Sequence, residues 1–167
     1  MGDVTLRGER LSLRPAREDD LETLTNILGA PEVARWWGTF DPARLRAELL
    51  GPGRFVILVD GAVRGWLAAE EEADPDYRQV GLDLFLAAGF HGRGYGPEAL
   101  RVAIDHYAAR GHHRFTIDPA VANRRAIRAY EKVGFRAVGV MRAYERGPDG
   151  TWHDNLLMEA LAAELDG

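Results

Sequence analysis

The chain contains no cysteine among its 167 residues. This absence excludes a disulfide framework, a thiol nucleophile and a thiolate metal site. The five histidines form no i, i+4 pair on an expected helix, and no group of carboxylates has the spacing of metal ligands. We therefore expect no bound metal.

Long apolar runs are also missing. No stretch of about 18 apolar residues is present, so no transmembrane helix is expected. The first residues, Met1 to Val4, lack the basic and apolar regions of a signal peptide. The chain has no internal repeat, low-complexity segment or dividing linker, so we expect one domain over residues 1–167, cytoplasmic and without a membrane partner.

Basic residues are fewer than acidic ones. The 21 lysines and arginines against 26 aspartates and glutamates give a net charge of −5. This balance argues against nucleic acid as a partner, because proteins that bind it carry basic patches. It is compatible with a cationic substrate.

Three of the 19 glycines, in contrast, fall within five positions of one stretch. A strand-like segment, Val80 to Leu86, leads to the loop His91-Gly92-Arg93-Gly94-Tyr95-Gly96 and then to Pro97, the expected first residue of a helix. Glycines at alternate positions allow a tight turn whose N–H groups converge, which favours phosphate at the helix start. Arg93 is expected to add a cationic fork there. The alternative is an ordinary tight connection, and the spacing matches neither a Walker loop nor a dinucleotide loop.

Apolar periodicity and turn residues predict the order β, α, α, β, β, β, α, β, α, β, β. This mixed order predicts an α+β domain with a mixed sheet of about six or seven strands and helices on both faces. Asp60-Gly61 predicts a tight hairpin turn, and Asn123 is expected to cap a helix that Gly134 ends. Trp36-Trp37-Gly38 is assigned to a connecting stretch.

The expected helix after Asn123 carries a second motif, N-R-R-A-I-R-A-Y-E-K-V-G-F over residues 123–135. With the glycine loop and the order of elements, it resembles the GNAT superfamily of acyl-CoA-dependent N-acetyltransferases over nearly the whole chain. One position departs from the family pattern, since His91 stands where glutamine or arginine is usual. The resemblance implies a GNAT fold, in which two parallel strands in the middle of the sheet splay apart, and acetyl-CoA as cosubstrate.

The resemblance also implies how acetyl-CoA binds. The coenzyme would lie between the strand of Leu84 and Leu86 and the next parallel strand, with its pyrophosphate in the glycine loop and its pantetheine amides extending the first strand. A free N–H near Leu86 would polarise the thioester carbonyl. Asn123 would bind the pantetheine arm, and Tyr130 would protonate the leaving thiolate unless it is only a core tyrosine. The implied coenzyme residues are Leu84, Leu86, His91, Gly92, Arg93, Gly94, Tyr95, Gly96, Asn123, Ala126 and Lys132.

A narrower resemblance, to aminoglycoside 6'-N-acetyltransferases, concerns the acceptor. It rests on the Trp36-Trp37-Gly38 turn, the Gly81-Leu82-Asp83 strand and the Thr116-to-Pro119 segment. It implies that Asp83 is the base that deprotonates the amine and that Asp118 holds the cationic drug. A carboxylate near the acetyl group attracts an ammonium ion and leads its proton away, so the amine attacks directly in a ternary complex. The alternatives are an outward-facing strand residue for Asp83 and an Asp-Pro turn for Asp118.

Two further features have open interpretations. Trp36 and Trp37 form either a flat wall for a sugar ring or a buried aromatic plug. The acidic segment from Glu70 to Asp76, with Glu72 as the candidate substrate residue, either lines the acceptor entrance or is a solvated loop.

Two alternative functions remain open. The Arg10-to-Pro15 start and the closing hairpin also resemble Rim-type acetyltransferases of ribosomal-protein N-termini, and a non-catalytic CoA-binding sensor is the other alternative. The donor is acetyl-CoA or a longer acyl-CoA, and the protein is a monomer or a homodimer.

Overall fold

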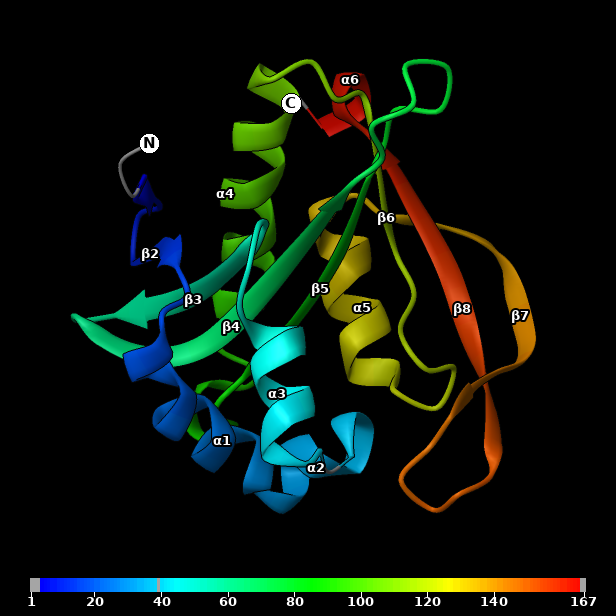
Figure 1. Cartoon of the computed structure of the whole chain (residues 1–167). Helices are drawn as coiled ribbons and strands as arrows, with labels where there is room; N and C mark the ends of the chain where they lie inside the picture. The colour runs from blue at the N-terminus through cyan, green and yellow to red at the C-terminus, as the bar shows by residue number, and fades with distance from the viewer. Residues whose placement is uncertain (1–3, 39, 166–167) are drawn as a thin grey trace.

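Within residues 4–38 and 40–165, which the computed structural model describes, eight strands form one mixed sheet (Figure 1). The expectations about Met1 to Asp3 and about the domain limits at both chain ends lie outside these residues. The strands are β1 Leu6–Arg7, β2 Leu11–Pro15, β3 Arg54–Val59, β4 Ala62–Glu71, β5 Val80–Leu86, β6 Arg114–Ile117, β7 Arg136–Arg146 and β8 Trp152–Leu161. The helices are α1 Leu21–Gly29, α2 Pro31–Trp37, α3 Pro42–Leu49, α4 Tyr95–Ala109, α5 Arg124–Val133 and α6 Ala162–Leu165, with the 3₁₀ turns η1 Glu18–Asp20 and η2 Ala88–Phe90.

Helices cover both faces of the sheet, as predicted. One buried cluster joins α4 to β2, β3, β4, β5 and β6, and a second joins α1, α2 and α3 to the opposite face. Figure 1 shows α1 to α3 on the near side of the sheet and α4 and α5 on the far side. The side chains alternate between these two clusters along β5, with Leu84 in the first and Phe85 in the second.

Several local predictions are confirmed. Asp60 and Gly61 connect β3 to β4 with φ angles of 53° and 79°, the left-handed values that a two-residue hairpin turn needs. The side chain of Asn123 accepts a hydrogen bond from the N–H of Ala126 and caps α5, which ends before Gly134. The closing hairpin of β7 and β8 also forms.

Other predictions need correction. The sheet has eight strands in the described residues, not about six or seven, because β1 adds a short edge. Trp36 and Trp37 end a helix, α2, whose first residue is Pro31, a favoured starting residue that the prediction overlooked. Helix α4 begins at Tyr95, two residues before Pro97. Gly94, in a left-handed conformation, ends the loop and is the N-cap of the helix.

The parallel strands β5 and β6 pair only over a short distance. Their register joins Val80 to Phe115 and Gly81 to Thr116, and beyond these pairs the strands diverge, as Figure 1 shows. The N–H of Leu84 donates to Asp83 Oδ1 at 3.0 Å, whereas the N–H of Ala87 donates to Arg64 on the β4 side. Because backbone direction alternates along a strand, the N–H groups of Leu84 and Leu86 face the gap between β5 and β6.

The described part of the chain has no helix whose length and apolar character would let it span a membrane.

A buried ion pair joins β2 to the helical layer. Arg14 donates from Nη1 and Nη2 to both oxygens of Asp20 at 2.8 and 2.9 Å, and the N–H of Arg17 donates to the same carboxylate. Asp20 is only 5% exposed. Burial works against the charge, but the bonds from Arg14 and Arg17 hold the pKa of Asp20 below its ordinary value.

The Asp20→Asn variant is expected to lower the free energy of unfolding at pH 7 by about 3 kcal/mol, because it removes the carboxylate charge to which the partly buried guanidinium of Arg14 is bonded. Urea denaturation measures this loss. Since the folded pKa is the lower one, the stabilisation is present above about pH 4 and is lost as pH falls through the folded pKa. The variant Asp19→Asn, at the exposed neighbouring position, is the control. The assignment would be contradicted if both variants lost the same free energy of unfolding. It would also be contradicted if the difference between Asp20→Asn and the unmodified protein did not shrink as the pH falls into the acid range.

Candidate active site

A cavity of about 1000 Å³ opens where β5 and β6 diverge. Its walls come from β5, the glycine loop, the start of α4, α2, α5 and the end of β7. Most of the sequence-predicted site residues line it: Trp36, Trp37, Asp83, Leu84, Leu86, His91, Gly92, Gly94, Tyr95, Gly96, Asp118, Asn123, Ala126, Tyr130 and Lys132.

The glycine loop forms one end of the cavity. Gly92 and Gly94 have φ angles of 70° and 83°, and Gly94 caps α4 without a side chain. The first N–H groups of α4 therefore have no capping side chain, which leaves them available to an anion such as a phosphate. Basic side chains from other elements surround this end: Arg10, Arg101, Arg125 and Lys132.

The ring of His91, the residue that departs from the family pattern, makes two polar contacts. Its Nε2 lies 2.8 Å from the carbonyl oxygen of Leu86, and its Nδ1 lies 3.4 Å from Nη2 of Arg125. Because a carbonyl oxygen only accepts, Nε2 must carry the proton and Nδ1 must accept from Arg125. The imidazole thus ties the loop to the end of β5 and to α5.

Arg93 does not present its guanidinium to the cavity. Its Nη1 donates to the carbonyl of Gly89 at 3.2 Å, and the guanidinium stacks over the ring of Phe90 at 5.2 Å. The guanidinium also lies 5.4 Å from the ring of Tyr95 and does not line the cavity, so the role of Arg93 in binding the pyrophosphate stays a prediction.

Asp83 lies at the other end of the cavity. Water reaches its side chain through the opening, but the carboxyl lies deep within the surrounding protein. That burial raises the pKa of Asp83 to about 7, and the negative charges of Asp118 and Glu145 add to the rise. The bond from the N–H of Leu84 acts in the opposite direction. A carboxylate of this pKa is suited to accept a proton near neutral pH.

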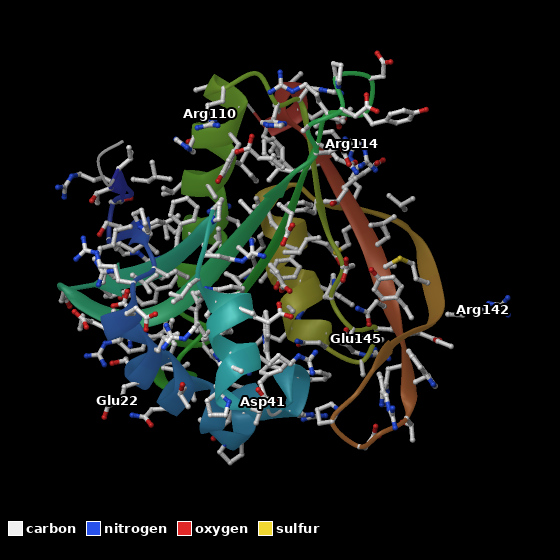
Figure 2. All side chains as sticks on the ribbon, in the orientation of Figure 1. Glu22, Asp41, Arg110, Arg114, Arg142 and Glu145 are labelled. Atoms are coloured by element: carbon white, nitrogen blue, oxygen red, sulfur yellow. The ribbon has the colours of Figure 1, made fainter. Side chains whose placement is uncertain are left out.

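Glu145 and Asn155 are site residues that the sequence reasoning missed. Asn155 is buried, and its Nδ2 donates to Glu145 Oε2 at 2.9 Å and to the carbonyl and Oδ1 of Asp118 at 2.9 and 3.3 Å. Figure 2 shows Glu145 on the side of the β7–β8 hairpin that faces α5, whereas Arg142 points away. An acid within a solvated hairpin has no local signal for this role, because only the fold of β7 brings it to the cavity.

Three carboxylates therefore share this cavity, Asp83, Asp118 and Glu145, and the charges of the last two raise the pKa of Asp83. Burial raises the pKa of Asp118, the bond from Asn155 lowers it, and Glu145 raises it further. An acidic end beside a basic end fits an anionic ligand and a cationic ligand bound together.

Tyr130 lies on α5 between these groups and lines the cavity. Its ring also packs edge-to-face on Phe135 at 6.4 Å, so it has a core contact in addition to the cavity. Burial, with the nearby charges of Asp83 and Asp118, raises the pKa of Tyr130 well above its ordinary value. The hydroxyl therefore stays protonated and can donate a proton.

The two tryptophans of α2 differ in their contacts. Trp37 packs edge-to-face on Trp66 and Phe85, with ring centres 5.7 and 5.1 Å apart. Trp36 lies under the guanidinium of Arg35 and lines both this cavity and a smaller neighbouring hollow of about 410 Å³. Trp37 thus acts largely as the aromatic plug, and Trp36 is the better candidate for a wall.

The structure does not bring Glu72 to the cavity. Asp83 pairs with Ala68 in the middle of β4, and Glu72 follows the far end of that strand. Its carboxylate accepts from the N–H of Asp74 at 3.0 Å, so this segment is a locally bonded loop. Among the described residues, no group of three or more His, Asp or Glu could hold a metal ion.

Comparisons with known proteins show which chains this one is similar to. The family model described as acetyltransferase (GNAT) domain matches residues 10–136. Aminoglycoside N(6')-acetyltransferase type 1 of Klebsiella pneumoniae is 28% identical over 88% of this chain and 82% of that protein.

Two solved structures share the fold. RimJ of Mycobacterium smegmatis, in complex with CoA-disulfide, has a TM-score of 0.82 and 26% identity over 99% of this chain and 89% of its own. AAC(6')-Ib, in complex with paromomycin and acetyl-CoA, has a TM-score of 0.74 and 26% identity over 95% of this chain and 98% of its own.

Replacing Glu145 by glutamine removes one of the negative charges that raise the pKa of Asp83. We expect that pKa to fall from about 7, measured by NMR titration of the aspartate carboxyl carbons. The matched control is Glu131→Gln, which removes a charge from an exposed position of α5 outside the cavity. An unchanged Asp83 pKa in Glu145→Gln, or the same fall in both variants, would contradict the coupling.

Proposed function

The chain belongs to the GNAT acetyltransferase family, and we propose that its acceptor is a polycationic small molecule, an aminoglycoside acetylated at its 6'-amine. The observation that carries the proposal is the group of carboxylates beside Tyr130: Asp83, Asp118 and Glu145. Several negative charges in one cavity attract a ligand with several ammonium groups. The 28% identity to an aminoglycoside 6'-N-acetyltransferase supports the same acceptor.

In the proposed reaction, the acceptor amine arrives as an ammonium ion. Asp83 takes one proton, directly or through water, and passes it to solvent. The freed nitrogen attacks the acetyl carbonyl carbon, so that the C–N bond forms and the C–S bond to CoA breaks. Tyr130 donates its hydroxyl proton to the leaving thiolate, and a second proton lost by the nitrogen replaces it.

We assign the coenzyme to the basic end of the cavity. The glycine loop and the uncapped start of α4 would receive the pyrophosphate, and the unpaired edge of β5 would receive the pantetheine amides. The N–H of Leu86 faces this gap and is placed to polarise the thioester carbonyl. Asn123 uses its side-chain oxygen to cap α5, so its NH₂ group is the donor left for the pantetheine arm.

A second candidate is acetylation of a protein N-terminus. The likeness to RimJ favours it, because it extends over 99% of this chain at a TM-score of 0.82. A peptide N-terminus offers one ammonium group, whereas the acidic end of this cavity presents three carboxylates to its ligand. The charge of the site therefore favours the polycation.

The acceptor is tested by a thiol-release assay with acetyl-CoA. We expect neomycin to be turned over with a kcat/KM at least about tenfold above that of a ribosomal-protein N-terminal peptide. Paromomycin, which has a hydroxyl in place of the 6'-amine of neomycin, is the matched substrate control and should give no 6'-acetylated product. Turnover of the peptide alone would replace the proposal with the second candidate.

The Asp83→Asn and Tyr130→Phe variants test the proton transfers. Each is expected to reduce kcat by about 10²- to 10⁴-fold while the variant still binds CoA.

Activity of the unmodified protein should rise with pH through about 7 as Asp83 ionises, and Asp83→Asn should lose that rise. The exposed α4 variant Asp105→Asn is the control. Unchanged turnover in Asp83→Asn would refute the assigned base, and CoA binding without any acetyl transfer by the unmodified protein would favour the sensor.

A further inference from the structure

The turn between β1 and β2, residues 8–10, is fixed against the first helical turn of α4. The carboxylate of Glu98 accepts three hydrogen bonds from this segment: the N–H of Arg10 at 2.7 Å, Nε of Arg10 at 2.8 Å and the N–H of Leu11 at 3.2 Å. A side chain at Gly8 would bring its Cβ within 2.8 Å of the same carboxylate. The N-terminal strands lie beside α4 in Figure 1, so this contact reaches the start of the helix from outside the glycine loop.

The guanidinium of Arg10 lies over the glycine loop itself. It stacks on the ring of Tyr95 at 4.4 Å, and its Nη1 donates to the carbonyl of Arg93 at 2.9 Å. A Cβ placed on Gly94 would come within 3.0 Å of Nη2 of Arg10. Gly94 therefore meets two constraints, a left-handed φ of 83° and the close approach of this cation.

Nη2 of Arg10 has no hydrogen-bond partner among the described residues, although Nε and Nη1 are both engaged. Arg10 lines the cavity, whereas Arg93 does not. Arg10, far away in the sequence, thus places a cation at the cavity beside the loop, held in place by Glu98 and Tyr95. A guanidinium fixed on two sides with one free donor group is preorganised to bind a phosphate oxygen.

We propose that Arg10 is a coenzyme-binding residue that faces the pyrophosphate of CoA, in the position that the sequence assigned to Arg93. The N-terminal turn is then part of the coenzyme site, and Glu98 is the residue that orients Arg10. The inference concerns the donor side and is independent of the amine that the protein acetylates.

The test compares CoA with pantetheine, which lacks the pyrophosphate. Binding is followed by the fluorescence of the protein's tryptophans, two of which, Trp36 and Trp37, line the cavity. The Arg10→Met variant keeps an apolar stem on Tyr95 and is expected to weaken CoA binding by about 10- to 100-fold. Its affinity for pantetheine should stay within about twofold of the unmodified protein, because that ligand has no phosphate for Arg10 to contact.

The matched control is Arg64→Met. Arg64 also stacks on an aromatic ring near the loop, that of Phe90 at 5.1 Å, but does not line the cavity, so CoA binding should change by less than about threefold. Arg93→Met should likewise have a smaller effect than Arg10→Met. The proposal is overturned if Arg10→Met leaves CoA affinity unchanged, if it weakens CoA and pantetheine equally, or if Arg93→Met has the larger effect.

A second variant covers the case in which Arg10→Met fails to fold, as judged by thermal denaturation. Arg10→Lys keeps the positive charge but lacks the planar fork whose three nitrogens point separately at Glu98, the loop carbonyl and the proposed phosphate. It is expected to weaken CoA binding by a smaller factor than methionine would, again without a loss for pantetheine. Full CoA affinity in Arg10→Lys would show that only charge is required and would overturn the oriented contact.

Discussion

The early end of pairing between β5 and β6 is the constraint on which the site depends. If the two strands stayed paired, their backbone N–H and C=O groups would bond to each other and no gap would open in the sheet. Here the register stops at Gly81 and Thr116, and the cavity occupies the space that opens. The same divergence leaves β5 without a strand partner on this side beyond Gly81, and there Asp118 raises the pKa of Asp83, which in turn raises that of Tyr130. An acyl thioester extended along β5 would restore the missing strand partner, so fold and donor binding are two aspects of one geometry.

Charge divides this cavity into two ends with different physical tasks. The basic end has backbone N–H groups and arginines from separate elements, which suit phosphates. At the acidic end, the charges of Asp118 and Glu145 lie close enough to raise the pKa of Asp83, and Glu145 also raises that of Asp118. Such repulsion costs free energy in the free protein and is relieved when a cation binds. In the proposed reaction, binding of an ammonium ion would also favour the ionised form of Asp83, which would couple acceptor binding to activation of the proposed base.

Sequence reasoning succeeded where the signal is local. Asp60-Gly61, the Asn123 cap and the glycine loop each specify a short conformation through their own backbone preferences, and the structure has all three. It failed where distant segments meet. Nothing near Glu145 indicates that a buried amide, Asn155, bonds it together with Asp118. Arg93 is the only arginine inside the loop motif, whereas Arg10, far away in the sequence, is the one that approaches Gly94 and lines the cavity.

The two ends of the cavity also differ in how they are built. The donor end proposed above consists of β5, the loop and α4, whose buried residues belong to the two core clusters on the faces of the sheet. The acceptor end depends on α2 and on β7, a long edge strand whose residues are almost all exposed. Changes in such a hairpin disturb few core contacts, whereas changes in β5 would disturb packing on both faces. Relatives named for aminoglycosides and RimJ share this fold at similar identity. We infer that the core preserves the coenzyme chemistry, and that the identity of the amine is determined by the periphery, where Glu145 and Trp36 lie.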